Sequence, residues 1–296
     1  MAAQLQHTVN APVQVSGVGV HGGQAVTLSI SPAAPDSGIA FLRTDVGDRD
    51  PRVPARADGV VETRLGTVIA NEAGVSVSTV EHLMAALCAL GLDNALVSLN
   101  GPEVPILDGS CEPFVSLLDR AGRRPQQARR RYLEILDTVE VSDGDKRATL
   151  RPAEGFEVAF DISFDDQIIG RQRLDMVIDE ASFRRDLADC RTFGFLHEVE
   201  ALRAAGLARG GSFDNVVVID AGAVLNPLGL RRPDEFVRHK AIDAIGDLYL
   251  LGSPLIGRFE GRYSGHELNN ALARAVLAQP AAWRRTAGPA ALARAV

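Results

Sequence analysis

The sequence has 296 residues, of which 46% are hydrophobic, so the chain can bury a large core and predicts two domains of about 100 to 200 residues each. Its formal net charge of −7 argues against a nucleic-acid-binding protein, which usually presents a basic surface. Three scattered cysteines without a C-x-x-C spacing predict neither a disulfide framework nor a thiolate metal cluster. Because we find no secretory signal pattern and no apolar run near the roughly 20 residues that span a bilayer, we expect a soluble protein of the reducing cytoplasm.

The N-terminal stretch predicts strands, because apolar residues alternate over residues 5–30 and again over 60–70. A loop at residues 17–23 interrupts the first of these stretches, and its four glycines surround His21. Such a loop either brings backbone close to a ligand or makes a tight hairpin. The glycine spacing of a phosphate-binding loop is absent, so the residues alone favour the hairpin.

A helix is predicted over residues 78–91, where apolar residues recur with helical period and Gly91 gives a C-terminal stop signal. Ser78 and Glu81 have the spacing of a capping box, so the simplest interpretation of Glu81 is a helix cap. His82 faces away from the apolar stripe, toward alanines that leave space beside an imidazole. That space allows His82 a role other than packing.

Residues 119–132 contain six arginines with glycine, proline and glutamine, and we interpret them as the linker between two patterned halves. The basic charge could contact an anionic membrane surface, although a solvated connector is favoured. The tail from Gln279 is rich in alanine, arginine and proline and is expected to be a surface helix or a frayed end. In the second half we expect strands over 132–141, 147–152, 157–163 and 216–219, and a helix over 198–205.

The segment 236–248 predicts a largely apolar, buried helix that carries His239 and Asp243 four residues apart, on one face. Asp247 lies at the edge of the same face. Buried charges are tolerated when they are paired or bind a metal. The residues leave two interpretations open here: a metal-ligand pair, or a satisfied core histidine beside a carboxylate at a domain contact.

The two halves show a weak symmetry, since each has a helix with a histidine near its beginning, followed by a glycine and a strand. Two similar domains facing each other would bring His82 and His239 into one cleft. Two histidines and one aspartate are the donors of a catalytic zinc site. Glu81, beside a ligand, could take a proton from water, and His266 could give one to a leaving amine.

Several segments together resemble the zinc-dependent UDP-3-O-acyl-N-acetylglucosamine deacetylases of lipid A biosynthesis. Each segment alone is weak evidence, but their combination in this order is specific, and the resemblance covers essentially residues 8 to 278. The segments that carry it are residues 17–21, 78–83 (S-T-V-E-H-L), 91–94, 105–110 (P-I-L-D-G-S), 191–195 (R-T-F-G-F), 236–247 and 264–270 (S-G-H-E-L-N-N).

The resemblance implies a role for each of these positions. Zinc would be held by His82, His239 and Asp243, with Glu81 as general base and His266 as the acid, aided by Asp247. Thr192 would donate a hydrogen bond to the carbonyl oxygen as it gains charge. Lys240 would bind the nucleotide sugar, and His21, Phe193 and Phe195 are further expected substrate contacts.

The family's fold is α+β, with two domains of similar β-α-α-β topology, each a small sheet layered on helices, and an active site between the helical layers. We therefore expect domains at 1–125 and 126–296, with an insertion at about 191–215 that forms a passage for the acyl chain. The expected partner is the acylated nucleotide sugar. We expect a monomer, with at most peripheral membrane contact.

Two positions depart from the family's pattern. Leu65-Gly66 stands where the family often has methionine followed by cysteine or serine, and Asp165-Asp166 stands in place of a usual His-Pro. Both departures concern substrate contacts rather than metal ligands. The alternative functions are a zinc hydrolase that acts on another amide and a non-catalytic binding protein of the same fold; the presence of Glu81, His266 and Thr192 argues against the latter.

Overall fold

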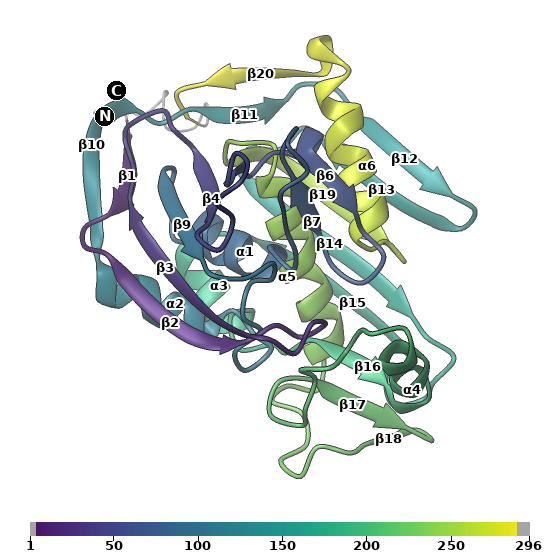
Figure 1. Ribbon diagram of the computed structural model, residues 1–296. Coiled ribbons are helices and arrows are strands. Elements are labelled where there is room, and N and C mark those ends of the chain that lie inside the picture. Colours follow the sequence, from purple (N-terminus) through teal and green to yellow (C-terminus); the bar gives the residue numbers. More distant parts are fainter. Residues whose placement is uncertain (1–3, 289–296) are drawn as a thin grey trace.

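The computed structural model describes residues 4–288 and shows an α+β protein, as the sequence predicts. Figure 1 shows the helices α1 and α5 side by side in the centre of the molecule, with sheets around them. Helix α2 packs against the first-half sheet, α5 and α6 pack against the second-half sheet, and α1 contacts both α2 and α5. None of the helices within residues 4–288 combines the length and apolar character needed to cross a bilayer.

The first half is built on a five-stranded sheet whose central strand, β9, pairs with β3 antiparallel and with β4 parallel. Residues of β9 alternate between buried and half-buried, as the period of two predicts. A smaller three-stranded sheet, β6 to β8, leads into α1. The elements are β2 (Val13–Val18), β3 (Ala25–Pro32), β4 (Ile39–Arg43), β5 (Arg52–Pro54), β6 (Val60–Glu62), β7 (Val68–Ala70), β8 (Ser76–Val77), α1 (Glu81–Ala89), β9 (Ala95–Leu99) and α2 (Glu112–Ala121).

The second half has a seven-stranded sheet with β19 at its centre, and a separate three-stranded sheet, β16 to β18, that forms a small lobe with α4 (Figure 1). The lobe begins within the predicted insertion of about 191–215 and extends beyond its end, to Val224. The elements are β11 (Tyr132–Ile135), β12 (Val139–Asp143), β13 (Lys146–Arg151), β14 (Phe156–Ser163), β15 (Arg171–Val177), α3 (Glu180–Asp186), β16 (Phe193–Phe195), α4 (Leu196–Ala204), β17 (Val217–Asp220), β18 (Ala223–Val224), α5 (Glu235–Tyr249), β19 (Leu255–Arg262), α6 (His266–Leu277) and β20 (Trp283–Thr286).

The arginine-rich segment is not the solvated connector that its composition suggests. Strand β10 (Arg123–Arg129) occupies half of it and pairs antiparallel with β1 (Leu5–Val9). Buried Gln126 accepts a hydrogen bond from Asn94 and donates one to the carbonyl of Ala33. Since the arginines of β10 face solvent while Gln126 points inward, the strand pattern was hidden by polar residues on both faces. The division into two domains, residues 1–125 and residues 126–296, stays a prediction.

The C-terminal tail also differs from expectation, because residues 283–286 form strand β20 rather than a helix or a frayed end. Strand β20 pairs antiparallel with β11, and Arg284 forms an ion pair with Glu134 at 2.8 Å. The partner strand lies some 150 residues earlier in the chain, so local composition could not reveal the pairing. Residues 289–296 of the predicted tail lie outside the described residues.

Helices α1 and α5 pack unusually closely at Gly246. A Cβ atom built on Gly246 would lie 2.0 Å from the carbonyl oxygen of Glu81, which is far inside van der Waals contact. Only a glycine fits at this crossing point. The contact brings the first turn of α1 against the C-terminal half of α5, and therefore sets the distance between the helices that carry His82 and His239.

We predict that Gly246→Ala lowers the free energy of unfolding by about 1 to 3 kcal/mol, the usual cost of overpacking a rigid contact. Urea denaturation followed by circular dichroism measures it. The matched control is Gly47→Ala, since Gly47 is exposed and a Cβ there meets no atom within 4 Å. Equal stability of the two variants would contradict the close packing.

Candidate active site

His82, at the start of α1, meets His239 and Asp243 from α5. Their candidate ligand atoms all lie within 4.8 Å of one another, and each residue is at most 4% exposed. Asp243 Oδ1 lies 3.7 Å from His82 Nε2 and 3.4 Å from His239 Nε2. Among the described residues, this buried oxygen has no hydrogen-bond partner. An orphaned carboxylate oxygen facing two imidazole nitrogens suits a metal ion, because a buried charge needs such compensation.

Neighbouring groups orient these three side chains. His239 Nδ1 lies 3.1 Å from the carbonyl oxygen of Cys190, which points Nε2 toward Asp243. Burial lowers the pKa of His239 to about 3, so the ring is neutral at pH 7 and has a free lone pair. Burial alone would raise the pKa of Asp243, but the Lys240 ammonium, 2.7 Å from Oδ2, and nearby imidazoles hold it well below its usual range.

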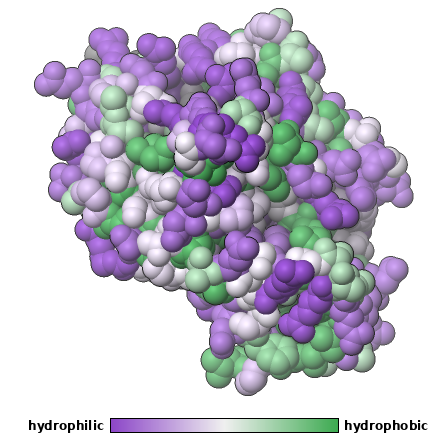
Figure 2. Space-filling view, viewed as in Figure 1, coloured by the Kyte–Doolittle hydropathy of each residue, from purple (hydrophilic) through white to green (hydrophobic). Residues whose placement is uncertain are grey.

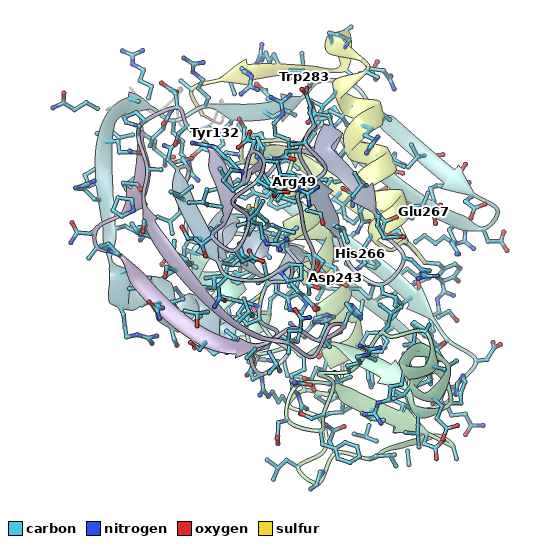
Figure 3. The ribbon with its side chains drawn as sticks, viewed as in Figure 1. Arg49, Tyr132, Asp243, His266, Glu267 and Trp283 are labelled. Carbon is cyan, nitrogen blue, oxygen red and sulfur yellow. The ribbon has the colours of Figure 1, made fainter. Side chains whose placement is uncertain are left out.

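Glu81 and His266 lie beside this group and face each other. His266 Nε2 lies 3.9 Å from Glu81 Oε1 and 3.8 Å from Asp243 Oδ2, and Figure 3 shows His266 next to Asp243. On the other side of its ring, His266 Nδ1 lies 3.0 Å from Asp247 Oδ2. Burial disfavours the charged ring, but the carboxylates of Asp247 and Asp243 outweigh it and raise the pKa of His266 to about 9.

Glu81 is not the helix cap that its spacing from Ser78 suggests. The residue before α1 is Val80, which makes no side-chain cap, and the Ser78 hydroxyl bonds to the carbonyl of Pro102. Glu81 instead turns its carboxylate into the site and is only 3% exposed. Burial raises the pKa of Glu81, although the imidazoles of His266 and His82 oppose the shift. A buried carboxylate with a raised pKa can accept a proton near neutral pH.

A cavity of about 800 Å³ opens from this group toward the small lobe. Its apolar wall includes Phe193, Phe195, Leu196, Val199 and Leu202, the side chains expected to surround an acyl chain. Figure 2 shows apolar residues on the surface of the small lobe that β16 to β18 form with α4. Every predicted site residue lines the cavity except Asp247, which lies buried behind His266.

The glycine-rich loop forms the hairpin that the residues alone favour, and its His21 lies at the cavity. Strands β2 and β3 form the expected antiparallel hairpin, while His21 lines the cavity with its Nε2 3.3 Å from the carbonyl oxygen of Leu65. Buried Glu103 holds the loop by accepting hydrogen bonds from the backbone N–H groups of His21 and Gly22. Glu103 was missed, because nothing in its local sequence signals a contact 80 residues away.

Of the residues at the two departures from the family's pattern, Leu65 lines the cavity, whereas Asp165 and Asp166 do not and only their neighbour Phe164 does. Phe164, beside Asp165, packs against Phe193 with ring centroids 5.8 Å apart. A Cβ on Gly66 would lie 2.8 Å from Glu81 Oε1, so that departure concerns the surroundings of Glu81 as well as the substrate contacts.

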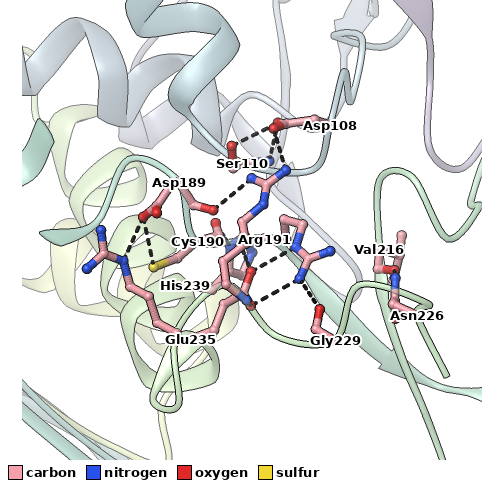
Figure 4. A network of polar contacts seen from close by, with 12 residues as sticks. Asp108, Ser110, Asp189, Cys190, Arg191, Val216, Asn226, Gly229, Glu235 and His239 are labelled. Carbon is pink, nitrogen blue, oxygen red and sulfur yellow. Dashed lines mark hydrogen bonds and ion pairs between the residues drawn. The ribbon is translucent and has the colours of Figure 1, made fainter. Parts of the chain in front are cut away.

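Sequence reasoning also missed the buried ion pair of Arg191 and Glu235, shown in Figure 4. Arg191 Nε lies 2.9 Å from Glu235 Oε1, and its backbone N–H donates to the same oxygen. Glu235 begins α5, whereas Thr192 follows Arg191 and is held by backbone bonds to Gly109 and Val217. The pair therefore ties the segment carrying Thr192 to the helix carrying His239.

The sequence profile of the family described as LpxC, UDP-3-O-acyl N-acetylglycosamine deacetylase, matches residues 6–278. The chain belongs to this family. A deacetylase of that name from Phenylobacterium zucineum is 65% identical over 280 residues, which cover 95% of this chain and 96% of the relative. Those from an Anaeromyxobacter species and from Neisseria meningitidis are 51% and 49% identical, covering 94% and 95% of this chain and 90% and 92% of the relatives.

We predict that the purified protein binds about one zinc ion per chain and that Asp243→Ala loses most of it, because the orphaned oxygen is the only anionic donor of the group. Metal analysis after dialysis measures the content. Asp234→Ala is the matched control, since it removes a carboxylate from the start of the same helix. Full zinc content in Asp243→Ala would remove Asp243 from the ligand set.

Proposed function

We propose that this chain hydrolyses the N-acetyl group of UDP-3-O-(3-hydroxyacyl)-N-acetylglucosamine, with zinc, to give acetate and UDP-3-O-acyl-glucosamine, an early committed step of lipid A biosynthesis. One observation carries the proposal: His82, His239 and Asp243 meet beside Glu81 and His266 at the end of a largely apolar cavity. Membership of the deacetylase family supports the substrate. The cavity can take the acyl chain that such a substrate carries.

His82, His239 and Asp243 would hold the zinc. When bound there, zinc polarises the amide carbonyl and lowers the pKa of a bound water toward about 7. Glu81 takes a proton from the attacking water, and its raised pKa suits this transfer. His266 delivers a proton from Nε2 to the leaving amine, because its other nitrogen is held by Asp247.

The remaining site residues bind and orient the substrate. The Thr192 hydroxyl donates to the carbonyl oxygen as it gains negative charge. Lys240 reaches the cavity from α5 and supplies a positive charge for the nucleotide sugar. Phe193 and Phe195 supply apolar wall for the acyl chain, and His21 contacts the substrate from the opposite half.

We also propose that the enzyme is cytoplasmic and that its two domains comprise residues 1–125 and 126–296. All three cysteines are free thiols, which suits a reducing compartment. The five-stranded and seven-stranded sheets are separate, which supports two domains, but strand β10 spans the proposed boundary and pairs with β1 of the first half. The monomeric state and any peripheral membrane contact stay predictions.

The direct test is acetate release from the purified protein and UDP-3-O-acyl-N-acetylglucosamine. We expect steady turnover that a chelator abolishes and added zinc restores. The same nucleotide sugar without its acyl chain should react much more slowly, because the apolar wall then contributes no binding energy. Hydrolysis of unrelated acetamides at an equal rate would favour a broader amide hydrolase.

We expect Glu81→Gln to retain zinc while kcat falls by roughly 10² to 10⁴, the usual contribution of a general base. Acetate release and metal analysis on the same sample measure both. Glu72→Gln is the control, since it makes the same change at an exposed position. Retention of wild-type kcat would rule out Glu81 as the base.

We expect kcat/KM to be bell-shaped in pH. Glu81 works deprotonated and burial raises its pKa, so the acidic limb should lie above the usual glutamate value of about 4.3. His266 works protonated, and its pKa of about 9 places the basic limb near that pH. Asp247→Asn removes a carboxylate that favours the imidazolium, so the basic limb should move to lower pH. The acidic limb should move less, because burial dominates the pKa of Glu81. An unchanged basic limb would contradict the pairing.

A further inference from the structure

Thr67 is fully buried in the short connection between β6 and β7, and it contacts three helices. Its backbone N–H donates to Glu81 Oε2 on α1 at 3.0 Å. Its hydroxyl donates to Asp247 Oδ1 on α5 at 2.5 Å. Asn270 of α6 donates from Nδ2 to the same hydroxyl at 3.3 Å. One side chain and its own amide thus reach both the proposed base and the partner of the proposed acid.

With Asp247 as a carboxylate, one arrangement of hydrogen atoms satisfies every contact of this network, in which the Thr67 hydroxyl oxygen also lies 3.4 Å from His266 Nδ1. Asn270 uses the Thr67 oxygen as an acceptor, so the single hydroxyl proton of Thr67 is free for Asp247. An ionised carboxylate only accepts, and Asp247 Oδ2 already receives Asn269 Nδ2 at 3.0 Å. His266 Nδ1, also at 3.0 Å from Oδ2, therefore carries a proton. The outer nitrogen, Nε2, is directed toward Glu81.

Glu81 and His266 do not hold each other in place. His266 Nε2 and Glu81 Oε1 are 3.9 Å apart, beyond hydrogen-bond distance. Among the described residues, the Thr67 N–H is the hydrogen-bond donor to the Glu81 carboxylate. The separation of base and acid is consequently set through Thr67, by its amide on one side and by its hydroxyl and Asp247 on the other.

We propose that Thr67 is a positioning residue for the deacetylation: its amide fixes Glu81, and its hydroxyl fixes His266 through Asp247. This inference rests on the proposed function. Proton transfers require donor and acceptor to be held within a few tenths of an ångström, so a residue that sets both positions controls kcat without contacting substrate. Thr67 is absent from the residues that line the cavity, which agrees with an indirect role.

The test compares Thr67→Val with Thr67→Ser. Valine removes the hydroxyl but keeps the size of the side chain and the N–H donor to Glu81; serine keeps the hydroxyl. We expect Thr67→Val to lower kcat by roughly 10- to 100-fold, as loss of an orienting partner does, with unchanged zinc content. KM should stay within about twofold, because ground-state binding is untouched. Thr67→Ser should restore kcat to within about threefold of wild type.

Thr149→Val is the matched control. Thr149 is also buried and its hydroxyl also donates to a carboxylate, that of Glu140, at 3.1 Å. It lies on β13, away from the cavity. We expect this variant to lose stability comparably and to keep wild-type kcat, which separates positioning from general stabilisation.

The Asp247→Ala background tests the route through Asp247. If the Thr67 hydroxyl acts through Asp247, then Thr67→Val should cost no more than about threefold in kcat once Asp247 is gone. The same fold-loss in both backgrounds would overturn the proposal. So would wild-type kcat in Thr67→Val, in a preparation whose wild-type enzyme releases acetate. A wild-type enzyme without acetate release would instead refute the proposed function, so the two failures are distinguishable. Should Thr67→Val not fold, Thr67→Ala replaces it in the same comparisons.

Discussion

Helices α1 and α5 approach each other so closely at Gly246 that any side chain there would overlap the carbonyl oxygen of Glu81. The contact lies at the first turn of α1, where Glu81 and His82 are adjacent. It lies one turn from Asp243 on α5. Because both helices are rigid, this crossing decides that His82 meets the ligands of α5 and that Glu81 faces the same cavity. The candidate site thus depends on residue 246 being a glycine, which has no Cβ atom.

The same crossing concentrates charge where water is excluded. Glu81, Asp243, Asp247, Lys240 and His266 each lie within 4 Å of at least one other member of this set, and burying such groups is costly unless each has a partner. Asp247 accepts from three donors, and Lys240 pairs with one oxygen of Asp243. Among these charged groups, Asp243 Oδ1 is the buried atom that has no hydrogen-bond partner within the described part of the chain, and it is the atom that faces the two imidazoles. A buried anionic oxygen without a hydrogen-bond partner is stabilised by a cation, and we therefore expect the cation at Asp243 Oδ1.

Elements outside the two helices determine what can reach this group. The pair of Arg191 and Glu235 attaches the segment with Thr192 to the start of α5, and the small lobe begins directly after that segment. The aromatic wall of the cavity therefore starts beside His239, where Phe193 lies with its ring centroid 6.4 Å from the imidazole. A long apolar substrate bound along the lobe would have its polar end at the candidate metal ligands.

The sequence by itself determined helices α1, α4 and α5, the candidate ligands and the chemistry they suit, because those properties reside in local spacing. His239 and Asp243 are one turn apart in any helix, and the combined segments around Glu81, His82 and His266 indicate the family. Only the tertiary structure decided that β10 and β20 are strands, since polar strands are recognised by distant partners rather than by their own pattern. It also decided the contacts of Thr67, whose amide and hydroxyl meet residues 14 and 180 positions away. Hydrogen bonds over such separations depend on how helices cross, and no local period encodes that crossing.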